Sequence, residues 1–271
     1  MVPMKLGLGY IVWWSLPDKI SVMRSEWPER FGKDFGIPME PLGDVLRRAL
    51  YAIKAPEGSK RLIRPLQAHD EWGLVIESYS DGESPLVYDF KLSVKLSPVG
   101  LEIALGDQQQ REFIQELKTN YEVELERVTP GCVADIVLRG VRGNCLAVQA
   151  RKTGGVYFVT ADYHNSIQRI ANFVLALGGN MYWFPINETP QAKKDLLKLV
   201  VEDLKNSIEI ARANIAARHK TDAVSEGTAA LDRVRYYREA LGMAAGQAKK
   251  IEKELNRLLV EALTKKEKGG K

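Results

Sequence analysis

A cluster of basic residues around one short hairpin is the feature of this sequence best suited to bind an anion. Arg139 and Arg142 lie at the end of a predicted helix, and Arg151 and Lys152 come just before Gly154-Gly155. Long cationic side chains are the donors that phosphate groups require. A short helix followed by a basic hairpin is typical of a winged helix, whose helix enters the DNA groove while the wing touches the backbone. The alternative is a structural hairpin with solvated charges.

Two further pairs of residues could contribute to the same chemistry. Arg47 and Arg48 lie mostly outside the apolar stripe of an earlier predicted helix, so they are available as further phosphate contacts. Trp13 and Trp14 are adjacent in a predicted strand, where neighbouring side chains point to opposite faces. One ring could therefore face outward for base stacking. The alternative is that one ring is in the core and helices cover the other.

The sequence contains no motif for catalysis, a cofactor or a metal. His69, His164 and His219 are isolated, and no nucleophile is identifiable beside any of them. The spacing of Cys132 and Cys145 leaves a disulfide open, but two reduced thiols are the simpler interpretation. No Cys-x-x-Cys or Cys/His cluster occurs, so we expect no structural zinc site. Phosphate-binding glycine motifs are also absent. We therefore expect a protein that is not an enzyme, although catalytic residues assembled from distant positions leave a hydrolase open.

Periodicity in the first 187 residues predicts an α+β body that is rich in antiparallel strands. Alternating apolar residues indicate strands, and apolar residues three or four apart indicate helices. Two segments each predict a helix followed by a hairpin, and this arrangement is winged-helix-like. The expected elements are a strand over 5–16, helices over 25–35 and 41–54, a strand meander over 62–105 with a turn at Asp81-Gly82, helices over 107–126 and 130–142, a hairpin over 146–159 that turns at Thr153-Gly154-Gly155, a helix over 162–177 and a strand over 181–186.

The last third predicts a long antiparallel coiled-coil hairpin. Thr189-Pro190 is a helix start, and apolar residues then step by four and three to Ile215. After a connection over 219–227, the same spacing runs unbroken to Ala262, which predicts one helix of about 35 residues and about 50 Å. We therefore expect two domains, 1–187 and 188–271, with a frayed basic tail and a further subdivision near 106 as an alternative.

Charge and hydropathy limit the cellular locations and the kinds of binding partner that we expect for this chain. The 271 residues carry a net charge of +4. Residues 189–271 hold 18 Lys/Arg against 12 Asp/Glu, whereas residues 1–188 hold 21 against 23. The positive excess therefore lies in the helical hairpin and permits contact with nucleic acid. The apolar run over 6–14 is too short to span a bilayer and lacks a cleavage site, so we expect no membrane association and a cytoplasmic location.

Three short strings resemble an uncharacterised family of prokaryotic and phage proteins. They are Ile11-Val-Trp-Trp-Ser15, Leu46-Arg-Arg-Ala49 and the hairpin string Val148 to Val159, which contains Arg-x-x-Gly-Gly-Val-Tyr-Phe-Val. The similarity covers roughly residues 10–215. It implies no reaction and no catalytic residue. It implies a phage or mobile-element setting, in which an accessory role in nucleic-acid transactions or assembly is more plausible than metabolism.

Two functional hypotheses follow. The first is a non-enzymatic DNA-binding or other nucleic-acid-associated accessory protein. The second is an interaction or scaffold protein whose coiled-coil hairpin, residues 190–265, docks a protein partner or a second copy. Leu196, Leu199, Val200 and Ile210 widen the apolar stripe beyond what two helices need. Either a partner covers this stripe or the chain's own β-rich body does.

Overall fold

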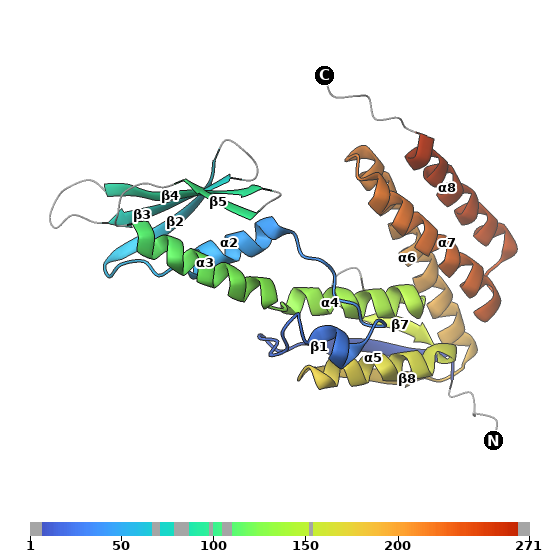
Figure 1. The fold of residues 1–271 in the computed structure, drawn as a ribbon. Helices are drawn as coiled ribbons and strands as arrows, with labels where there is room; N and C mark the ends of the chain where they lie inside the picture. The colour runs from blue at the N-terminus through green and yellow to red at the C-terminus, as the bar shows by residue number, and fades with distance from the viewer. Residues whose placement is uncertain are drawn as a thin grey trace. The chain divides into compact units, whose positions relative to one another are not determined.

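The computed structural model describes residues 7–66, 71–78, 87–97, 100–104, 110–151 and 154–264 (Figure 1). Its helices and antiparallel sheets confirm the α+β class. Contacts divide the chain into an inserted unit, residues 20–129, and a main unit, residues 1–19 with 130–271. The division differs from the predicted boundary between 187 and 188. The reason is that the N-terminal strand pairs with strands beyond residue 150 and so joins the two ends of the chain in one unit.

The inserted unit is a four-stranded antiparallel meander with two helices on one face. Its sheet order is β2-β3-β4-β5, which confirms the predicted meander. Leu46 and Leu50 from α2 and Leu117 from α3 share a buried core with Leu74 and Leu92 of the sheet. The predicted turn at Asp81-Gly82 lies outside the described residues. The elements are α1 (Trp27–Phe31), α2 (Leu42–Ala52), β2 (Ser59–Pro65), β3 (Glu71–Ser78), β4 (Val87–Ser97), β5 (Gly100–Ala104) and α3 (Gln110–Glu126).

The main unit contains a second antiparallel sheet, of order β6-β7-β1-β8. Strand β1 therefore lies inside the sheet, between strands that follow it by more than 140 residues. The elements are β1 (Gly9–Ser15), α4 (Pro130–Leu138), a π-helical turn η1 (Arg139–Asn144), β6 (Val148–Gln149), β7 (Tyr157–Thr160), a 3₁₀ turn η2 (Ala161–Tyr163), α5 (His164–Ala176), β8 (Asn180–Ile186), α6 (Pro190–Ala216), α7 (Lys220–Ala240) and α8 (Ala245–Thr264).

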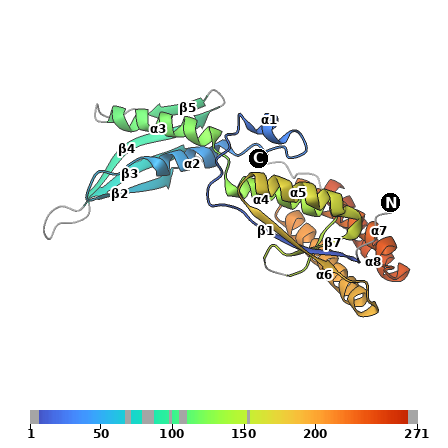
Figure 2. The same cartoon turned by 90° about the horizontal axis from the view of Figure 1, so that it is seen from below.

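Helices cover the two faces of this sheet differently. Because side chains alternate along a strand, Tyr10 and Val12 face one side and Ile11 faces the other. The first side carries α4 and α5, and the Tyr10 hydroxyl lies 2.9 Å from Nδ1 of His164 at the start of α5. The second side carries α6, and Figure 2 shows α6 across β1 from α4 and α5. There Val148 and Phe158 share a buried core with α6, α7 and α8.

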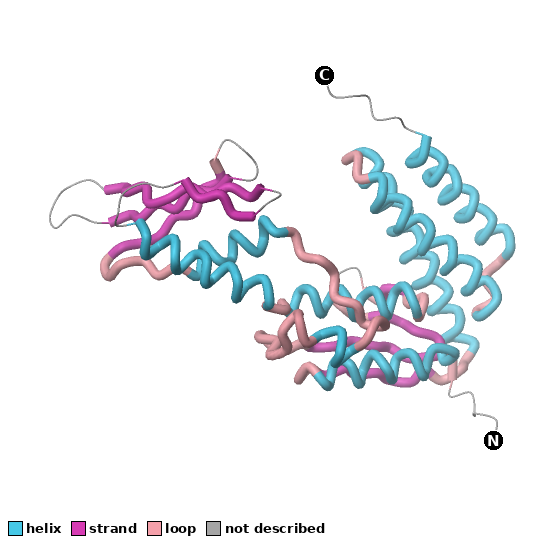
Figure 3. Tube along the Cα trace, in the orientation of Figure 1, coloured by secondary structure: helices cyan, strands magenta, loops and turns pink. Residues whose placement is uncertain are grey.

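The C-terminal third is three helices, not the predicted two (Figure 3). The predicted 35-residue helix is wrong because the chain breaks after Ala240, where Gly242 adopts a φ of 70° that ends a helix. Helix α8 then folds back along α7. The predicted connection over 219–227 is also wrong, because α7 begins at Lys220. Gly227 lies inside α7, where an added Cβ would come within 2.9 Å of Leu259, so its small size lets the helices approach closely.

Local signals at other helix ends are confirmed. The Thr189 side chain accepts a hydrogen bond of 3.1 Å from the Ala192 N–H and so caps α6. Helix α5 ends where Gly178 takes a φ of 82°. The wide apolar stripe of α6 is also explained. Leu196 and Val200 are buried in the core shared with the sheet, so the chain's own body covers this part of the stripe.

Candidate functional site: an aromatic platform on the main sheet

Three aromatic rings form a continuous surface on the side of the main sheet that carries α6. We call Trp13, Tyr182 and Phe184 the aromatic platform. In the ladder Trp13 pairs with Tyr182, so all three side chains project from the same face. The Trp13 ring lies 5.4 Å from Tyr182 and 5.2 Å from Phe184, at interplanar angles of 24° and 11°. The Trp13 ring is therefore nearly parallel to the other two rings and stacks on both of them across β1 and β8.

The platform is open because α6 covers only part of this face. Helix α6 packs over Val148 of β6 and Phe158 of β7, which are fully buried. On β8, by contrast, Tyr182 is 44% exposed and Phe184 is 58% exposed. Two large rings on neighbouring positions of one face thus meet solvent. Exposed, stacked aromatic rings on a sheet are the surface on which single-stranded nucleic acids place their bases.

Trp14 has a different environment from its neighbour. Its ring stacks on Tyr157 of β7, at 5.5 Å and 13°, on the opposite face of the sheet from Trp13. Both tryptophans are half-buried. Of the two alternatives drawn from the sequence, the structure supports an outward ring at Trp13, whose contacts come from strand β8.

The predicted hairpin exists, but it is not a free wing. Strand β6 has only two residues, and β7 lies between β6 and β1 with all four of its residues buried. The hairpin is therefore part of the main sheet, with β6 as its edge strand and β7 paired to β1. Of the predicted turn at Thr153-Gly154-Gly155, Thr153 lies outside the described residues. Gly154 has a φ of 92°, and the Ala150 N–H bonds to the Val156 carbonyl at 2.8 Å.

The hairpin tip lies at the same end of the sheet as the platform. Gln149 pairs with Tyr157, and Tyr157 pairs with Val12, so Arg151, two residues after Gln149, lies about level with Trp14 near the Ser15 end of β1. Arg151 is exposed and lines a hollow of about 440 Å³ with residues of α6 that include Lys205 and Asn206. Strands are about 4.8 Å apart, so the tip lies roughly 15 Å across the sheet from Tyr182. Lys152 lies outside the described residues.

Arg142 does not act as predicted, because two carboxylates bind it. Its guanidinium lies 3.5 Å from Asp203 and 3.7 Å from Glu226. Asp203 is buried, accepts a hydrogen bond of 3.0 Å from the Gln149 N–H, and lies 3.4 Å from the Nε of Arg233, which is also buried. We call these four charged side chains the buried ion network. It ties η1, β6, α6 and α7 together and makes Arg142 a structural residue.

The network also sets the ionisation of Glu226. Burial raises the pKa of the Glu226 carboxyl, but a hydrogen bond to Ser207 and the charges of Arg233 and Arg142 outweigh it. The pKa of Glu226 is therefore lowered below its ordinary value.

Arg139, on the same π-helical turn as Arg142, is exposed.

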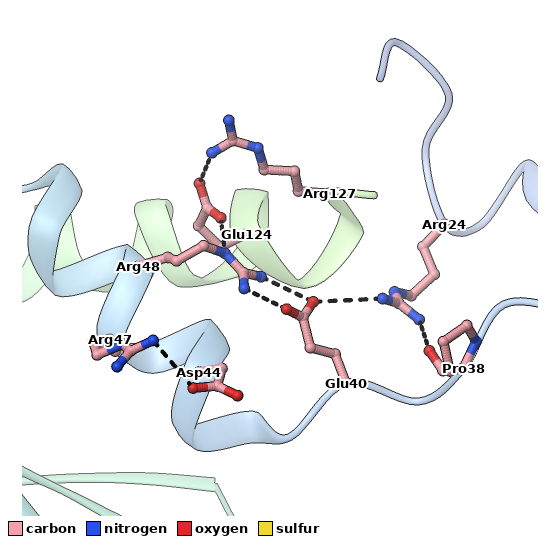
Figure 4. Close-up of polar contacts among 8 residues, drawn as sticks. All are labelled: Arg24, Pro38, Glu40, Asp44, Arg47, Arg48, Glu124 and Arg127. Atoms are coloured by element: carbon pink, nitrogen blue, oxygen red, sulfur yellow. Dashed lines mark hydrogen bonds and ion pairs between the residues drawn. The ribbon is translucent and has the colours of Figure 1, made fainter. Parts of the chain in front are cut away.

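The remaining predicted pair, Arg47 and Arg48, lies in the inserted unit (Figure 4). Arg48 donates from Nε to Glu124 at 2.7 Å and from Nη2 to Glu40 at 3.0 Å. Burial lowers the pKa of Arg48, but these two carboxylates outweigh it and the pKa is raised. Arg48 is thus held between α2, α3 and the segment before α2. Arg47 is exposed and lies 3.5 Å from Asp44, one helical turn away.

The five predicted contacts that the structure describes are therefore divided between the two units. Arg142 and Arg48 are structural, and Arg139, Arg151 and Arg47 are exposed on two different units. Sequence reasoning missed Tyr182 and Phe184. The signal that could have found them is the string Met181-Tyr-Trp-Phe-Pro-Ile186, which places two aromatic rings at alternate positions of one short strand.

The residues considered for hydrolysis have structural partners. His164 contacts the Tyr10 hydroxyl, and Asp162 accepts a hydrogen bond of 2.8 Å from the Tyr236 hydroxyl. Within the described ranges, His, Cys, Asp and Glu side chains form no group of three that could hold a metal. In that same part of the chain, no helix has both the length and the apolar character needed to cross a bilayer.

The chain belongs to DUF6744, a family of unknown function, whose family model matches residues 7–268. This range includes both units and all three rings of the platform. Comparison with curated proteins and with solved structures found no match.

Proposed function

We propose that this member of DUF6744 is a non-enzymatic accessory protein that binds single-stranded nucleic acid on the aromatic platform. The observation that carries the proposal is the open stack of Trp13, Tyr182 and Phe184. Base–aromatic stacking contributes about 1–3 kcal/mol per base and is tolerant of sequence, because every base has a π face. In a duplex the base faces are already stacked on one another. The platform therefore favours single strands.

The surrounding charges support the same proposal. Arg151 lies roughly 15 Å from Tyr182 by the spacing of strands, a distance that a short stretch of single strand can span. A base on the platform and a phosphate near the hairpin tip could thus belong to one strand. In this proposal, stacking on the three rings rather than charge supplies most of the binding free energy. That balance distinguishes the proposal from duplex binding by a basic groove.

The cellular setting is part of the proposal. Cys132 and Cys145 are both buried and are not joined in a disulfide, which supports a reducing compartment such as the cytoplasm. The resemblance to phage proteins supports a role in the nucleic-acid transactions of a phage or mobile element.

Fluorescence anisotropy with a labelled single strand and the matching duplex tests the proposal. We expect tighter binding to the single strand and a weak salt dependence. If about two or three phosphates are neutralised, the slope of log K against log salt is about −2. Equal affinity for the duplex, or no binding at low salt, would overturn the proposal.

Two variants localise the contact. Tyr182→Ala removes a platform ring that is 44% exposed, and Leu175→Ala removes an apolar side chain that is 65% exposed on α5, on the other face of the sheet. Loss of one stacked base weakens binding by about 5- to 150-fold. Leu175→Ala should leave affinity unchanged. Equal effects of the two variants would place the binding surface elsewhere.

A further inference from the structure

Strand β8 has an open edge that lacks the usual protection against pairing. In the described part of the chain its one strand neighbour is β1. The seven residues Asn180 to Ile186 contain no charge, and Tyr182 and Phe184 are exposed. Monomeric proteins commonly place lysines, inward-pointing charges or bulges on such edges, because unpaired N–H and C=O groups attract another strand. Proline also protects such edges, and Pro185 is the one protective residue in β8.

The backbone groups that face the open edge can be assigned. The Ile186 carbonyl accepts a hydrogen bond of 2.8 Å from the Leu8 N–H, so it is directed toward the β1 side. Alternate residues of a strand direct both backbone groups to the same side. Met181, Trp183 and Pro185 therefore face the open edge. Pro185, which has no N–H, stands where it removes no bond to β1, as is usual for an edge proline.

We propose that two copies of the chain pair through β8 in antiparallel fashion, with the two-fold axis at Trp183. Trp183 then pairs with Trp183 of the partner subunit, and Met181 pairs with Pro185 of the partner subunit. The N–H groups of Met181 and Trp183 and the outward carbonyls form about four hydrogen bonds across the axis. The missing N–H of Pro185 costs one bond at each end and leaves the centre intact.

A second copy suits this edge better than an unrelated strand does. The pairing sets Tyr182 opposite Phe184 of the partner subunit, and the two-fold axis repeats this aromatic pair. Aromatic cross-strand pairs stabilise antiparallel strands, and the absence of charge on β8 removes any like-charge repulsion between copies. A two-fold contact also closes on itself, so it forms a dimer and not a fibre.

The dimer is compatible with ligand on the platform but does not depend on it. Pairing uses backbone groups in the plane of the sheet, whereas bases would contact side chains that project from one face of it. The two platforms would join into one surface across the axis. The contact lies on β8, so it differs from self-association through residues 190–265.

Sedimentation velocity on the full chain without nucleic acid tests the proposal. Between about 1 and 200 µM, a range suited to a small interface, we expect the mass to rise from 30.4 kDa toward twice that value. A constant monomer mass at the highest concentration would overturn it. This result would leave binding of single strands untouched, so the two proposals fail separately.

Charge substitution at the paired rings locates the contact. In Tyr182→Lys/Phe184→Lys, lysines face lysines across the axis, and Tyr182→Glu/Phe184→Glu places carboxylates there. Each variant alone should remain a monomer, because like charges are opposed. An equimolar mixture should restore the dimer, which misfolded variants could not do. If either variant dimerises like the unmodified chain, or if mixing restores nothing, the assignment to β8 is wrong.

Discussion

Asp203→Asn is expected to destabilise the main unit by about 3–5 kcal/mol, because it removes one charge from the buried ion network. Asp203 and Arg233 have side chains that are 0% and 1% exposed, so solvent cannot replace the lost partner. The substitution keeps the shape of the side chain and an oxygen for the Gln149 N–H. The loss is therefore electrostatic and leaves no cavity. Arg233 and Arg142 would then share Glu226 alone.

Urea denaturation followed by far-ultraviolet circular dichroism measures this effect. With a slope of about 2–3 kcal/mol per M, the midpoint should fall by roughly 1–2 M. Asp195→Asn is the matched control on the same helix. Asp195 lies 3.6 Å from Lys198 and is 54% exposed, so its loss should change stability by no more than about 1 kcal/mol. Equal midpoints for the two variants would refute the view that the network holds the unit together.

Three further predictions concern the helices, the acid limb of stability and the thiols. Leu255 is fully buried in α8, so Leu255→Ala should cost about 2–5 kcal/mol in a urea melt, whereas Asn256→Ala, at an exposed position, should cost no more than about 0.5 kcal/mol. The pKa of Glu226 is lowered from 4.5 in the folded chain, so its stabilisation is present above pH 4.5 and is lost as pH falls through the folded-state pKa; Glu226→Gln should flatten the acid limb of a stability–pH curve. Burial raises the pKa of the Cys145 thiol to about 11, although a hydrogen bond with Ser166 lowers this pKa. Iodoacetamide at pH 8 should therefore label Cys145 only after urea unfolds the chain.

Strongly periodic segments were predictable because the apolar spacing and the caps agree. The helix start at Thr189 and the stop at Gly178 show this. The break between α7 and α8 was missed because the spacing of four and three continues across it. Leu241 and Ala248 are both buried, but the intervening Ala244 is exposed and Met243 takes its place in the core. Gly242 carried the signal of a break, and a pattern based on apolar residues does not weigh a glycine.

Partners far apart in sequence explain the other differences. Nothing local to Arg142 indicates that Asp203, 61 residues later, neutralises it. The same is true of Arg48 and Glu124, which are 76 residues apart. Whether Tyr182 and Phe184 meet solvent depends on strand order, because the same string in an inner strand under α6 would be covered. Strand order is a tertiary property, and β1 joins this sheet across the whole inserted unit.

A substitution series at Phe184 tests the central claim most directly. Phe184 is the most exposed ring of the platform, so exchanging its side chain changes stacking with little effect on the fold. Affinity for a labelled single-stranded oligonucleotide is measured by anisotropy at one fixed salt concentration. If bases stack on the platform, Phe184→Trp, with a larger π face, should bind at least as tightly as the unmodified chain, and Phe184→Ala should bind about 5- to 150-fold more weakly. Unchanged affinity in Phe184→Ala would contradict stacking of bases on the platform.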